Sequence, residues 1–214
     1  MHVVVGLGKT GVSCVRWLRA QGVAVRAIDT RDEPPGIDAV RAEFPGLEIH
    51  LGGLHADWLL TASAIVASPG VAVAEPAIAA AAAAGVPVLG DIELFARRVR
   101  APVLGITGSN GKSTVTALVG EFARAAGLKV AVGGNFGTPA LDLLADDVQL
   151  YVLELSSFQL ETTHSLALAG ATVLNLSADH MDRYASLAEY GMAKQRIYAH
   201  CATAVVNRDD DWSA

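Results

Sequence analysis

The run Val103-Leu-Gly-Ile-Thr-Gly-Ser-Asn-Gly-Lys-Ser-Thr114 joins an apolar stretch, a glycine-rich turn and a lysine followed by hydroxyl residues. The apolar part predicts a β-strand, and the residues from Gly111 onward have a helical pattern. Gly108 and Gly111 would let the backbone turn tightly, so that consecutive amide groups converge on phosphate oxygens at the positive end of that helix. Lys112 would then reach the β- and γ-phosphates of a nucleotide, and Ser113 would hold Mg²⁺. The segment therefore predicts a phosphate-binding loop.

A second interpretation of this loop stays open. The strict phosphate-loop pattern has a glycine five residues before Gly111, and this chain has Ile106 there. An ordinary strand-to-helix turn that happens to contain two glycines would give a similar sequence. Lysine and a hydroxyl residue in the first helical turn serve no packing purpose, however, so phosphate binding is the favoured interpretation.

Composition and net charge narrow the class of protein. Hydrophobic residues make up 52% of the 214-residue chain and charged residues 18%, so a substantial core is possible and disorder is disfavoured. The net charge is −6 and there is no basic cluster, which argues against nucleic-acid binding. Cys14 and Cys201 lie in apolar, helix-like stretches and have neither metal-ligand nor disulfide spacing. No uninterrupted apolar run reaches about 18 residues and no signal-peptide pattern is present, so we expect a cytoplasmic protein without membrane insertion.

Short Val/Ile-rich runs alternate with longer helical patterns along the chain. This alternation predicts an α/β fold with βαβ units and mainly parallel sheets. The predicted strands are 2–6, 23–28, 47–51, 64–67, 87–89, 102–107, 129–132, 149–154, 171–175 and 203–206. The predicted helices include 9–21, 55–62, 75–84, 111–126 and 186–200.

Two glycine-rich strand-to-helix turns, at Gly6 and Gly108, divide the chain. Each would open its own sheet, so we expect two domains, 1–91 and 92–214. The charged residues 208–211 follow a predicted strand with no helix after it, which is unusual for a parallel-sheet domain. We therefore expect the second domain to be incomplete.

The first domain carries Gly6-Leu-Gly8-Lys-Thr-Gly11 between a strand and a helix, which is the G-x-G-x-x-G spacing of dinucleotide-binding sites. Asp29 ends the next strand, roughly where an acidic partner of a ribose is expected. Thr30 and Arg31 leave room for another ligand, because Asp and Thr can bond a base and Arg can stack on it. A solvated loop would also explain these residues. Ser68-Pro-Gly70 marks a further place where the backbone can approach a ligand.

In the second domain, polar residues follow three apolar strands. They are Gly133-Gly-Asn135, Glu154-Leu-Ser-Ser-Phe-Gln159 and Asn175-Leu-Ser-Ala-Asp-His-Met-Asp-Arg183. In a parallel sheet all three face the same carboxyl edge as the phosphate loop. Glu154 is the strongest metal candidate, with a structural ion pair as the alternative. His180 is either a loop histidine or a ligand, and Lys194 by itself would pass for a solvated helical lysine.

With these residues assembled, the chain resembles the Mur ligases of bacterial peptidoglycan synthesis. The run Leu-Glu-Leu-Ser-Ser-Phe-Gln-Leu-Glu at 153–161 resembles the D-glutamate-adding branch of that family in particular. The other matching segments are Gly-Leu-Gly-x-Thr-Gly at 6–11, Asp-Thr-Arg at 29–31, Ser-Pro-Gly at 68–70, Gly-Asp-Ile-Glu-Leu-Phe at 90–95, Thr-Gly-Ser-Asn-Gly-Lys-Ser-Thr at 107–114, Gly-Gly-Asn at 133–135 and Asp-His-Met-Asp-Arg-Tyr at 179–184.

The resemblance implies a Rossmann-like domain for a UDP-linked substrate, a central ATPase domain of the P-loop type and a C-terminal ligase domain. We expect the first to be complete, the second to be cut partway and the third to be absent, so that this chain alone would not turn over. The implied reaction is the ATP-dependent addition of D-glutamate to UDP-N-acetylmuramoyl-L-alanine through an acyl phosphate, with ATP and Mg²⁺ as cofactors.

The resemblance also implies roles for individual residues. The uridine diphosphate would be held by Lys9, Thr10, Asp29, Thr30, Arg31, Ser68 and Gly70. Lys9 departs from the apolar residue that the family often has, so only its backbone role transfers. The muramoyl end would meet Asn135, Ser156, Gln159 and His180. The ATP phosphates would lie on Gly108, Ser109, Asn110, Gly111, Lys112, Ser113 and Thr114. One Mg²⁺ would bind Ser113 and Glu154, and a second would bind His180 and a carbamylated Lys194.

Two other classes stay open at this point. A dinucleotide-dependent oxidoreductase explains the first glycine motif but leaves the phosphate loop unused. A non-catalytic nucleotide-binding module explains both loops but gives no reason for Glu154 and His180 to meet at one edge.

Overall fold

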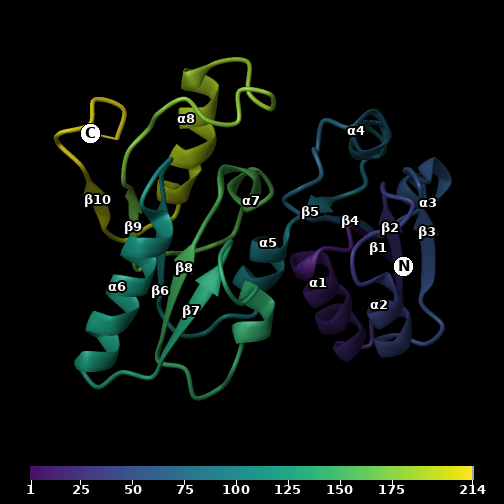
Figure 1. Cartoon of the computed structure of the whole chain (residues 1–214), viewed down its shortest axis with the longest axis horizontal. Coiled ribbons are helices and arrows are strands. Elements are labelled where there is room, and N and C mark those ends of the chain that lie inside the picture. Colours follow the sequence, from purple (N-terminus) through teal and green to yellow (C-terminus); the bar gives the residue numbers. More distant parts are fainter. Residues whose placement is uncertain (214) are drawn as a thin grey trace. The chain divides into compact units, whose positions relative to one another are not determined.

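The structure is a computed structural model that describes residues 1–213. The chain divides into two compact units, Met1–Asp91 and the residues from Ile92 onward. Each unit is a parallel β-sheet with helices, as Figure 1 shows. The predicted α/β class is therefore confirmed.

The first unit contains a five-stranded sheet in the order β3-β2-β1-β4-β5. All neighbouring strands run parallel. The strands are β1 (His2–Val5), β2 (Val25–Asp29), β3 (Glu48–Leu51), β4 (Ala64–Ala67) and β5 (Val88–Leu89), and the helices are α1 (Lys9–Ala20), α2 (Ile37–Glu43), α3 (Ala56–Leu60) and α4 (Pro76–Ala83). From β1 the chain first winds to one side and then returns to β4 on the other. Ligands of open α/β sheets bind at such a switch point, outside the carboxyl ends of the strands.

The core of the first unit lies between this sheet and its helices. Val3, Val5, Ile28 and Ile65 from the strands pack with Leu59 and Ile78 of α3 and α4, and all six are buried. The central strands β1 and β4 are largely continuous apolar runs because both faces of a parallel sheet are covered.

The second unit contains a five-stranded parallel sheet in the order β10-β9-β6-β8-β7. The strands are β6 (Val103–Thr107), β7 (Val130–Gly134), β8 (Leu150–Glu154), β9 (Gly170–Val173) and β10 (Ala204–Val206). The helices are α5 (Asp91–Ala96), α6 (Lys112–Ala125), α7 (Ser157–Glu161) and α8 (Leu187–Gln195), with 3₁₀ turns at Ala140–Leu143 and Arg196–Tyr198. The strand that leads into the phosphate loop, β6, lies at the centre of the sheet.

The structure differs from the prediction in several helices. The predicted helix 186–200 ends at Gln195 and continues as a 3₁₀ turn. There the guanidinium of Arg196 bonds the carbonyl groups of Leu160 and Thr163, and tertiary contacts of this kind override helical periodicity. The short helices α2, α5 and α7 were not predicted, although the capping box Ser156-x-x-Gln159 signals the start of α7. Cys201 lies in a β-bridge with Leu168 and not in a helix.

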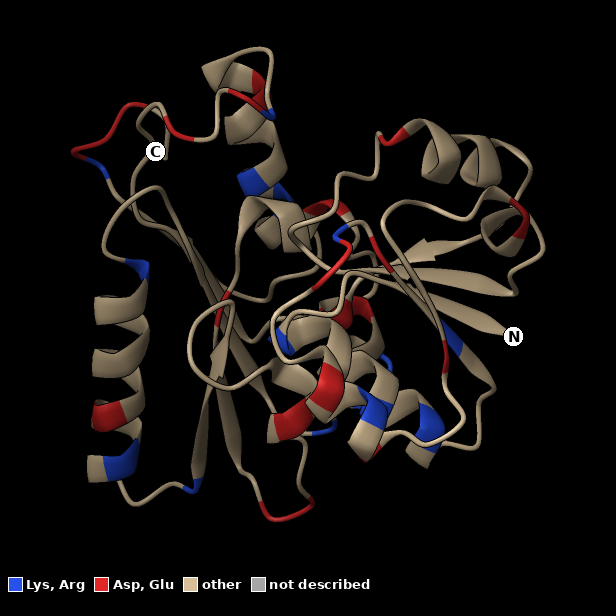
Figure 2. Cartoon of the chain, turned by 45° about the vertical axis from the view of Figure 1, so that its right-hand side comes forward, with Lys and Arg blue, Asp and Glu red and all other residues tan. Residues whose placement is uncertain are grey.

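Charge and hydropathy are distributed without a dominant feature. In Figure 2 basic and acidic segments are interspersed in both units. None of the helices in residues 1–213 combines the length and the hydropathy that a membrane span requires.

Candidate functional site

The glycine-rich turn of the first unit is shaped by close backbone contacts. A Cβ atom on Gly11 would lie 1.7 Å from the carbonyl oxygen of Gly6, so no larger residue fits there. Gly6 has a φ of +92°, and its carbonyl accepts a hydrogen bond of 2.8 Å from the Ser68 hydroxyl. A Cβ atom on Gly8, by contrast, would meet nothing within 4 Å. The middle glycine therefore faces open space, where a ligand can approach the backbone.

Asp29 organises this turn from the end of β2. Its carboxylate is 2% exposed and accepts a 2.7 Å hydrogen bond from the Leu7 amide. It also accepts bonds of 2.8 Å from both Nε and Nη2 of Arg31. The Arg31 guanidinium and the Leu7 amide outweigh burial and hold the pKa of Asp29 at about 2. Asp29 is thus ionised and already paired within the protein.

The other predicted residues of this unit surround the same turn. Lys9 and Thr10 form the first turn of α1, Thr30 and Arg31 are exposed beside Asp29, and Gly70 is exposed beyond β4. Ser68 is buried and its hydroxyl bonds Gly6, so it braces the turn. Within residues 1–213 no acceptor contacts the amide groups of Gly8, Lys9 and Thr10, because α1 has no side-chain cap. The helix end can therefore receive an anion.

The phosphate loop of the second unit follows β6 and leads into α6, at the carboxyl edge of the sheet (Figure 1). Gly108 and Gly111 have φ values of +150° and +78°, which favour glycine. The Lys112 ammonium donates to the Ser109 carbonyl at 3.1 Å and so folds back over the loop.

Three polar side chains from separate elements meet beside this loop. The Ser113 hydroxyl donates to Glu154 Oε2 at 2.6 Å, and Asn135 Nδ2 donates to Glu154 Oε1 at 2.7 Å. Glu154 ends β8 and is 2% exposed, while Asn135 follows β7. No Lys, Arg or His forms an ion pair with Glu154 among the residues that the structure describes. The structural ion pair that sequence alone left open is therefore absent there.

Lys194 of α8 is buried against the phosphate loop. Its side chain is 1% exposed, and its ammonium donates to the Gly108 carbonyl at 2.9 Å and lies 4.5 Å from the ring centre of Tyr190. Burial, reinforced by the charge of Lys112, lowers the pKa of Lys194 to about 7, although Asp179 and Glu154 oppose this shift. The interpretation of Lys194 as a solvated lysine is wrong.

His180 lies on the exposed loop between β9 and α8. Its ring packs 4.9 Å from the ring of Phe158, and Nε2 lies 3.5 Å from Asp179 Oδ2. It is the one non-glycine residue between positions 1 and 213 with a positive φ, at 54°. The described contacts of its ring are with Asp179, Phe158 and Tyr190 rather than with Glu154 or Lys194. The structure thus brings Ser113, Glu154, Asn135 and Lys194 to the loop, and among the described contacts none joins His180 to these four residues.

Ser156 and Gln159 serve the fold of α7. The Ser156 hydroxyl accepts from the Gln159 amide, and Gln159 Oε1 accepts from the Ser156 amide. Gln159 is 1% exposed. Sequence reasoning assigned both to a ligand and missed this cap, which the S-x-x-Q spacing signals.

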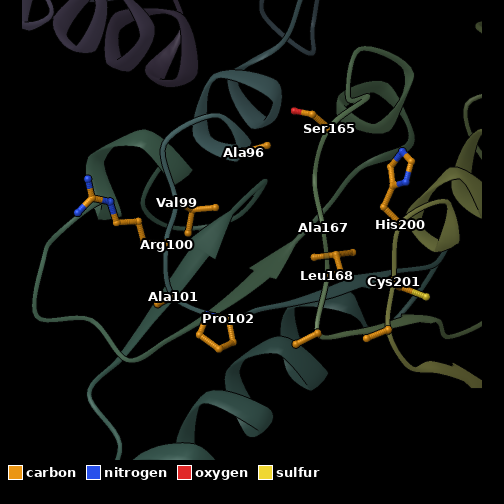
Figure 3. Close-up of a pocket in the computed structure, with 12 residues that line it drawn as sticks. Ala96, Val99, Arg100, Ala101, Pro102, Ser165, Ala167, Leu168, His200 and Cys201 are labelled. Atoms are coloured by element: carbon orange, nitrogen blue, oxygen red, sulfur yellow. The ribbon is translucent and has the colours of Figure 1, made fainter.

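Two further observations concern possible metal ligands and the position of a cavity. Residues 1–213 contain no group of three or more His, Cys, Asp and Glu side chains placed to hold a metal. The cavity in Figure 3, of about 550 Å³, is lined by residues just before β6, β9 and β10, among them Pro102, Leu168 and Cys201. It therefore lies at the amino edge of the sheet, away from the phosphate loop.

Two family models match the chain. The model described as "Mur ligase MurD-like, N-terminal domain" matches residues 1–90, and the "Mur ligase middle domain" matches residues 106–214, just over half of the chain. The chain belongs to the Mur ligase family. The resemblance drawn from the motifs is thereby confirmed.

Curated Mur ligases are similar over nearly the whole chain. The UDP-N-acetylmuramoylalanine–D-glutamate ligase of Methylobacillus flagellatus is 59% identical over 99% of this chain and 47% of that protein. The enzyme of the same name from Sodalis glossinidius is 61% identical over 97% of this chain and 47% of that protein. The chain thus spans about half the length of the curated relatives it matches.

Solved Mur ligase structures share the fold. UDP-N-acetylmuramate–alanine ligase MurC from Thermotoga maritima matches with a TM-score of 0.59 at 21% identity, over 99% of this chain and 50% of that one. A murein peptide ligase from Psychrobacter arcticus matches with a TM-score of 0.55 at 18% identity, over 94% of this chain and 47% of that one.

Proposed function

We propose that this chain supplies the UDP-substrate site and the ATP phosphate site of a ligase that adds D-glutamate to UDP-N-acetylmuramoyl-L-alanine. The proposed ATP site rests on the contact of Ser113 with Glu154 at 2.6 Å, beside a glycine-rich loop that leads into a helix. The substrates are inferred from the names of relatives that are 57–61% identical to this chain. ATP and the UDP-linked substrate are nucleotides of the cytoplasm, so we place the activity there.

The phosphate loop is proposed to hold ATP, with residues 92–214 as the ATP-binding domain. Its free helix-end amides and Lys112 would neutralise phosphate charge. Mg²⁺ prefers oxygen ligands, and the Ser113 hydroxyl and Glu154 carboxylate offer two at one point. When bound there, Mg²⁺ would neutralise the charge of the phosphates. The residues present therefore fit this ion.

Residues 1–91 are proposed to bind the UDP part of the other substrate. The open space at Gly8 and the free amides at the start of α1 suit a diphosphate. Arg31, half-exposed and held by Asp29, would offer its flat guanidinium to the uracil ring. Asp29, Thr30 and the backbone near Gly70 would complete this pocket, and Ser68 would hold its shape.

The proposed reaction has two steps. The terminal carboxylate of UDP-N-acetylmuramoyl-L-alanine attacks the γ-phosphorus of ATP, which forms an acyl phosphate and releases ADP. The amine of D-glutamate then attacks the acyl carbon, loses a proton, releases phosphate and forms the amide. The protein's part is positioning and charge neutralisation, which dominate such transfers. Asn135 and His180 would face the muramoyl end, with Ser156 and Gln159 supporting them through α7.

Lys194 is proposed to be carbamylated. Its pKa of about 7 leaves a large share of neutral amine at physiological pH, and only the neutral amine attacks carbon dioxide. The carbamate would supply anionic oxygens which, with His180, offer a second Mg²⁺ site. In ¹³C-bicarbonate, the chain should show a carbamate carbon resonance that Lys194→Arg removes and Lys129→Arg, at an exposed lysine, retains. A resonance that survives Lys194→Arg would rule this assignment out.

Thermal unfolding with separate ligands tests the function. A ligand at 100 times its dissociation constant stabilises a protein by about 2.7 kcal/mol, which is readily measured. We expect the chain to be stabilised by Mg-ATP and by UDP-N-acetylmuramoyl-L-alanine. Stabilisation by NAD⁺ alone would overturn the proposal in favour of a dinucleotide-dependent oxidoreductase.

A further inference from the structure

The phosphate loop is joined to the segment after β9 by a set of side-chain hydrogen bonds. Asn175 Oδ1 accepts from the Asn110 amide at 2.9 Å, and Asn175 Nδ2 donates to the Asn110 carbonyl at 3.1 Å. The Asn175 carbonyl also accepts from the Ser109 amide at 3.0 Å. One asparagine thus pairs with two consecutive loop residues through three hydrogen bonds.

Ser177 extends the same pairing. The Ser109 hydroxyl donates to the Ser177 carbonyl and accepts from the Ser177 amide, both at 3.0 Å. Asn110 Nδ2 donates to the Ser177 hydroxyl at 3.1 Å. These side-chain bonds lie just beyond the point where the paired strands β6 and β9 end.

This pairing divides the amide groups of the loop into two sets. Those of Ser109 and Asn110 are used by Asn175. Those of Gly111, Lys112 and Ser113 have no acceptor within residues 1–213. Because backbone amides bind an anion only if they converge on one point, the direction of the second set depends on how firmly the first is held.

We infer that Asn175 is a positioning residue for nucleotide phosphate. It clamps Ser109 and Asn110, and thereby aims the amides of Gly111 to Ser113 at the ligand. It touches no reacting atom. The same hydrogen bonds help to fix the shape of a loop that has Ile106 where the strict phosphate-loop pattern has glycine. The inference rests on the proposed binding of ATP phosphates.

The test compares Asn175→Ala with Gln149→Ala in the whole chain. Gln149 is a matched control, because its side chain accepts from the Lys129 amide and its own amide donates to the Lys129 carbonyl, just before β8 and β7. Titration calorimetry with Mg-ATP and with inorganic triphosphate should show about tenfold weaker binding for Asn175→Ala. Tenfold corresponds to about 1.4 kcal/mol, the size expected for lost hydrogen bonds of a polar side chain. Gln149→Ala should bind as the wild type does.

Amide hydrogen exchange gives a readout that needs no ligand. Asn175→Ala should speed exchange at the Asn110 amide, which loses its side-chain acceptor, and less so at Ser109, whose amide keeps the backbone carbonyl of residue 175. Gln149→Ala should leave both unchanged. Ser177→Ala, which removes only the exposed bond to Asn110, should weaken binding about twofold and serves if Asn175→Ala does not fold.

The possible outcomes distinguish the proposed ATP site from the positioning role of Asn175. A wild-type chain that binds neither Mg-ATP nor triphosphate would overturn the proposed ATP site and this inference with it. Wild-type binding that Asn175→Ala and Ser177→Ala both retain in full would overturn the inference alone.

Discussion

At the scale of single residues, the Asp29 carboxylate lies at the proposed ligand-binding edge, yet its hydrogen bonds are made with other groups of the protein. Its oxygens accept from the Leu7 amide in the glycine turn and from the Arg31 guanidinium. Asp29 therefore fixes both the loop and the side chain proposed to meet the base. A substitution there is expected to act on stability as well as on ligand binding.

Asp29 should make stability depend on acidity. Its pKa is about 2 in the folded chain and 3.8 ordinarily, so its stabilising effect is complete above pH 3.8 and is lost as the pH falls through 2. The loss amounts to at most about 2.5 kcal/mol. Urea unfolding between pH 5 and pH 2 should show that Asp29→Asn is less stable at pH 5 and less sensitive to acid than the wild type. Asp38→Asn, at a side chain 95% exposed, is the control and should follow the wild type. Equal acid sensitivity in the wild type and Asp29→Asn would contradict this assignment.

At the scale of elements, the short helix α5 is held by one buried carboxylate. Glu93 is 2% exposed and accepts from the amides of His164 and Ser165, from the Ser165 hydroxyl and from Arg97 Nε. Burial alone would raise the pKa of Glu93, but these donors outweigh it and hold the pKa below its usual value. A helix of six residues is not stable through helix propensity alone. The tertiary hydrogen bonds of Glu93 are therefore what keep α5 helical.

Glu93→Gln should therefore destabilise the chain strongly. The amide nitrogen of Gln would face donors that need an acceptor, and we expect a loss of about 2–4 kcal/mol in the free energy of unfolding. Glu121→Gln is the matched control, since Glu121 also pairs with an arginine a few positions further along the chain but is exposed on α6. Its expected cost is below about 0.5 kcal/mol. Urea unfolding of both variants provides the comparison, and equal stabilities would disprove the anchor.

At the scale of the whole molecule, the two proposed ligands belong to different units. The glycine turn, Asp29 and Arg31 lie within Met1–Asp91, and the phosphate loop lies within the second unit. Each site is built on the carboxyl edge of its own sheet. A change in one site should therefore leave ligand binding at the other intact.

Lys112→Ala should weaken the binding of one ligand and not of the other. It removes the cation beside the loop, so stabilisation by Mg-ATP should fall to near zero, while stabilisation by UDP-N-acetylmuramoyl-L-alanine should persist. Lys129→Ala, at an exposed lysine of the same unit, should keep both responses. Thermal unfolding with each ligand measures this, and full retention of the Mg-ATP response would argue decisively against Lys112 as the phosphate anchor.

The sequence by itself determined the fold class and the ten strands, and it predicted where polar residues gather at the sheet edges. These features depend on local patterns: apolar runs of strand length, helical periodicity, and glycines at turns that only glycine allows, such as Gly11 and Gly108. The same patterns indicated that Glu154 would lie at the edge that carries the phosphate loop, because parallel strands bring their carboxyl ends to one edge. The pairing of Glu154 with Ser113 was implied by the family resemblance, and the two side chains are in contact at 2.6 Å.

Only the tertiary structure decided what each polar side chain contacts. Lys194 reads as a solvated helical lysine, yet it is buried against Gly108, which is 86 positions away in the chain. The Glu93 carboxylate accepts hydrogen bonds that hold α5, and the side chains of Ser156 and Gln159 cap α7. The Asn175 side chain bonds the phosphate loop. The physical reason is that burial and hydrogen-bond partners arise between segments far apart in sequence, where no local periodicity reports them.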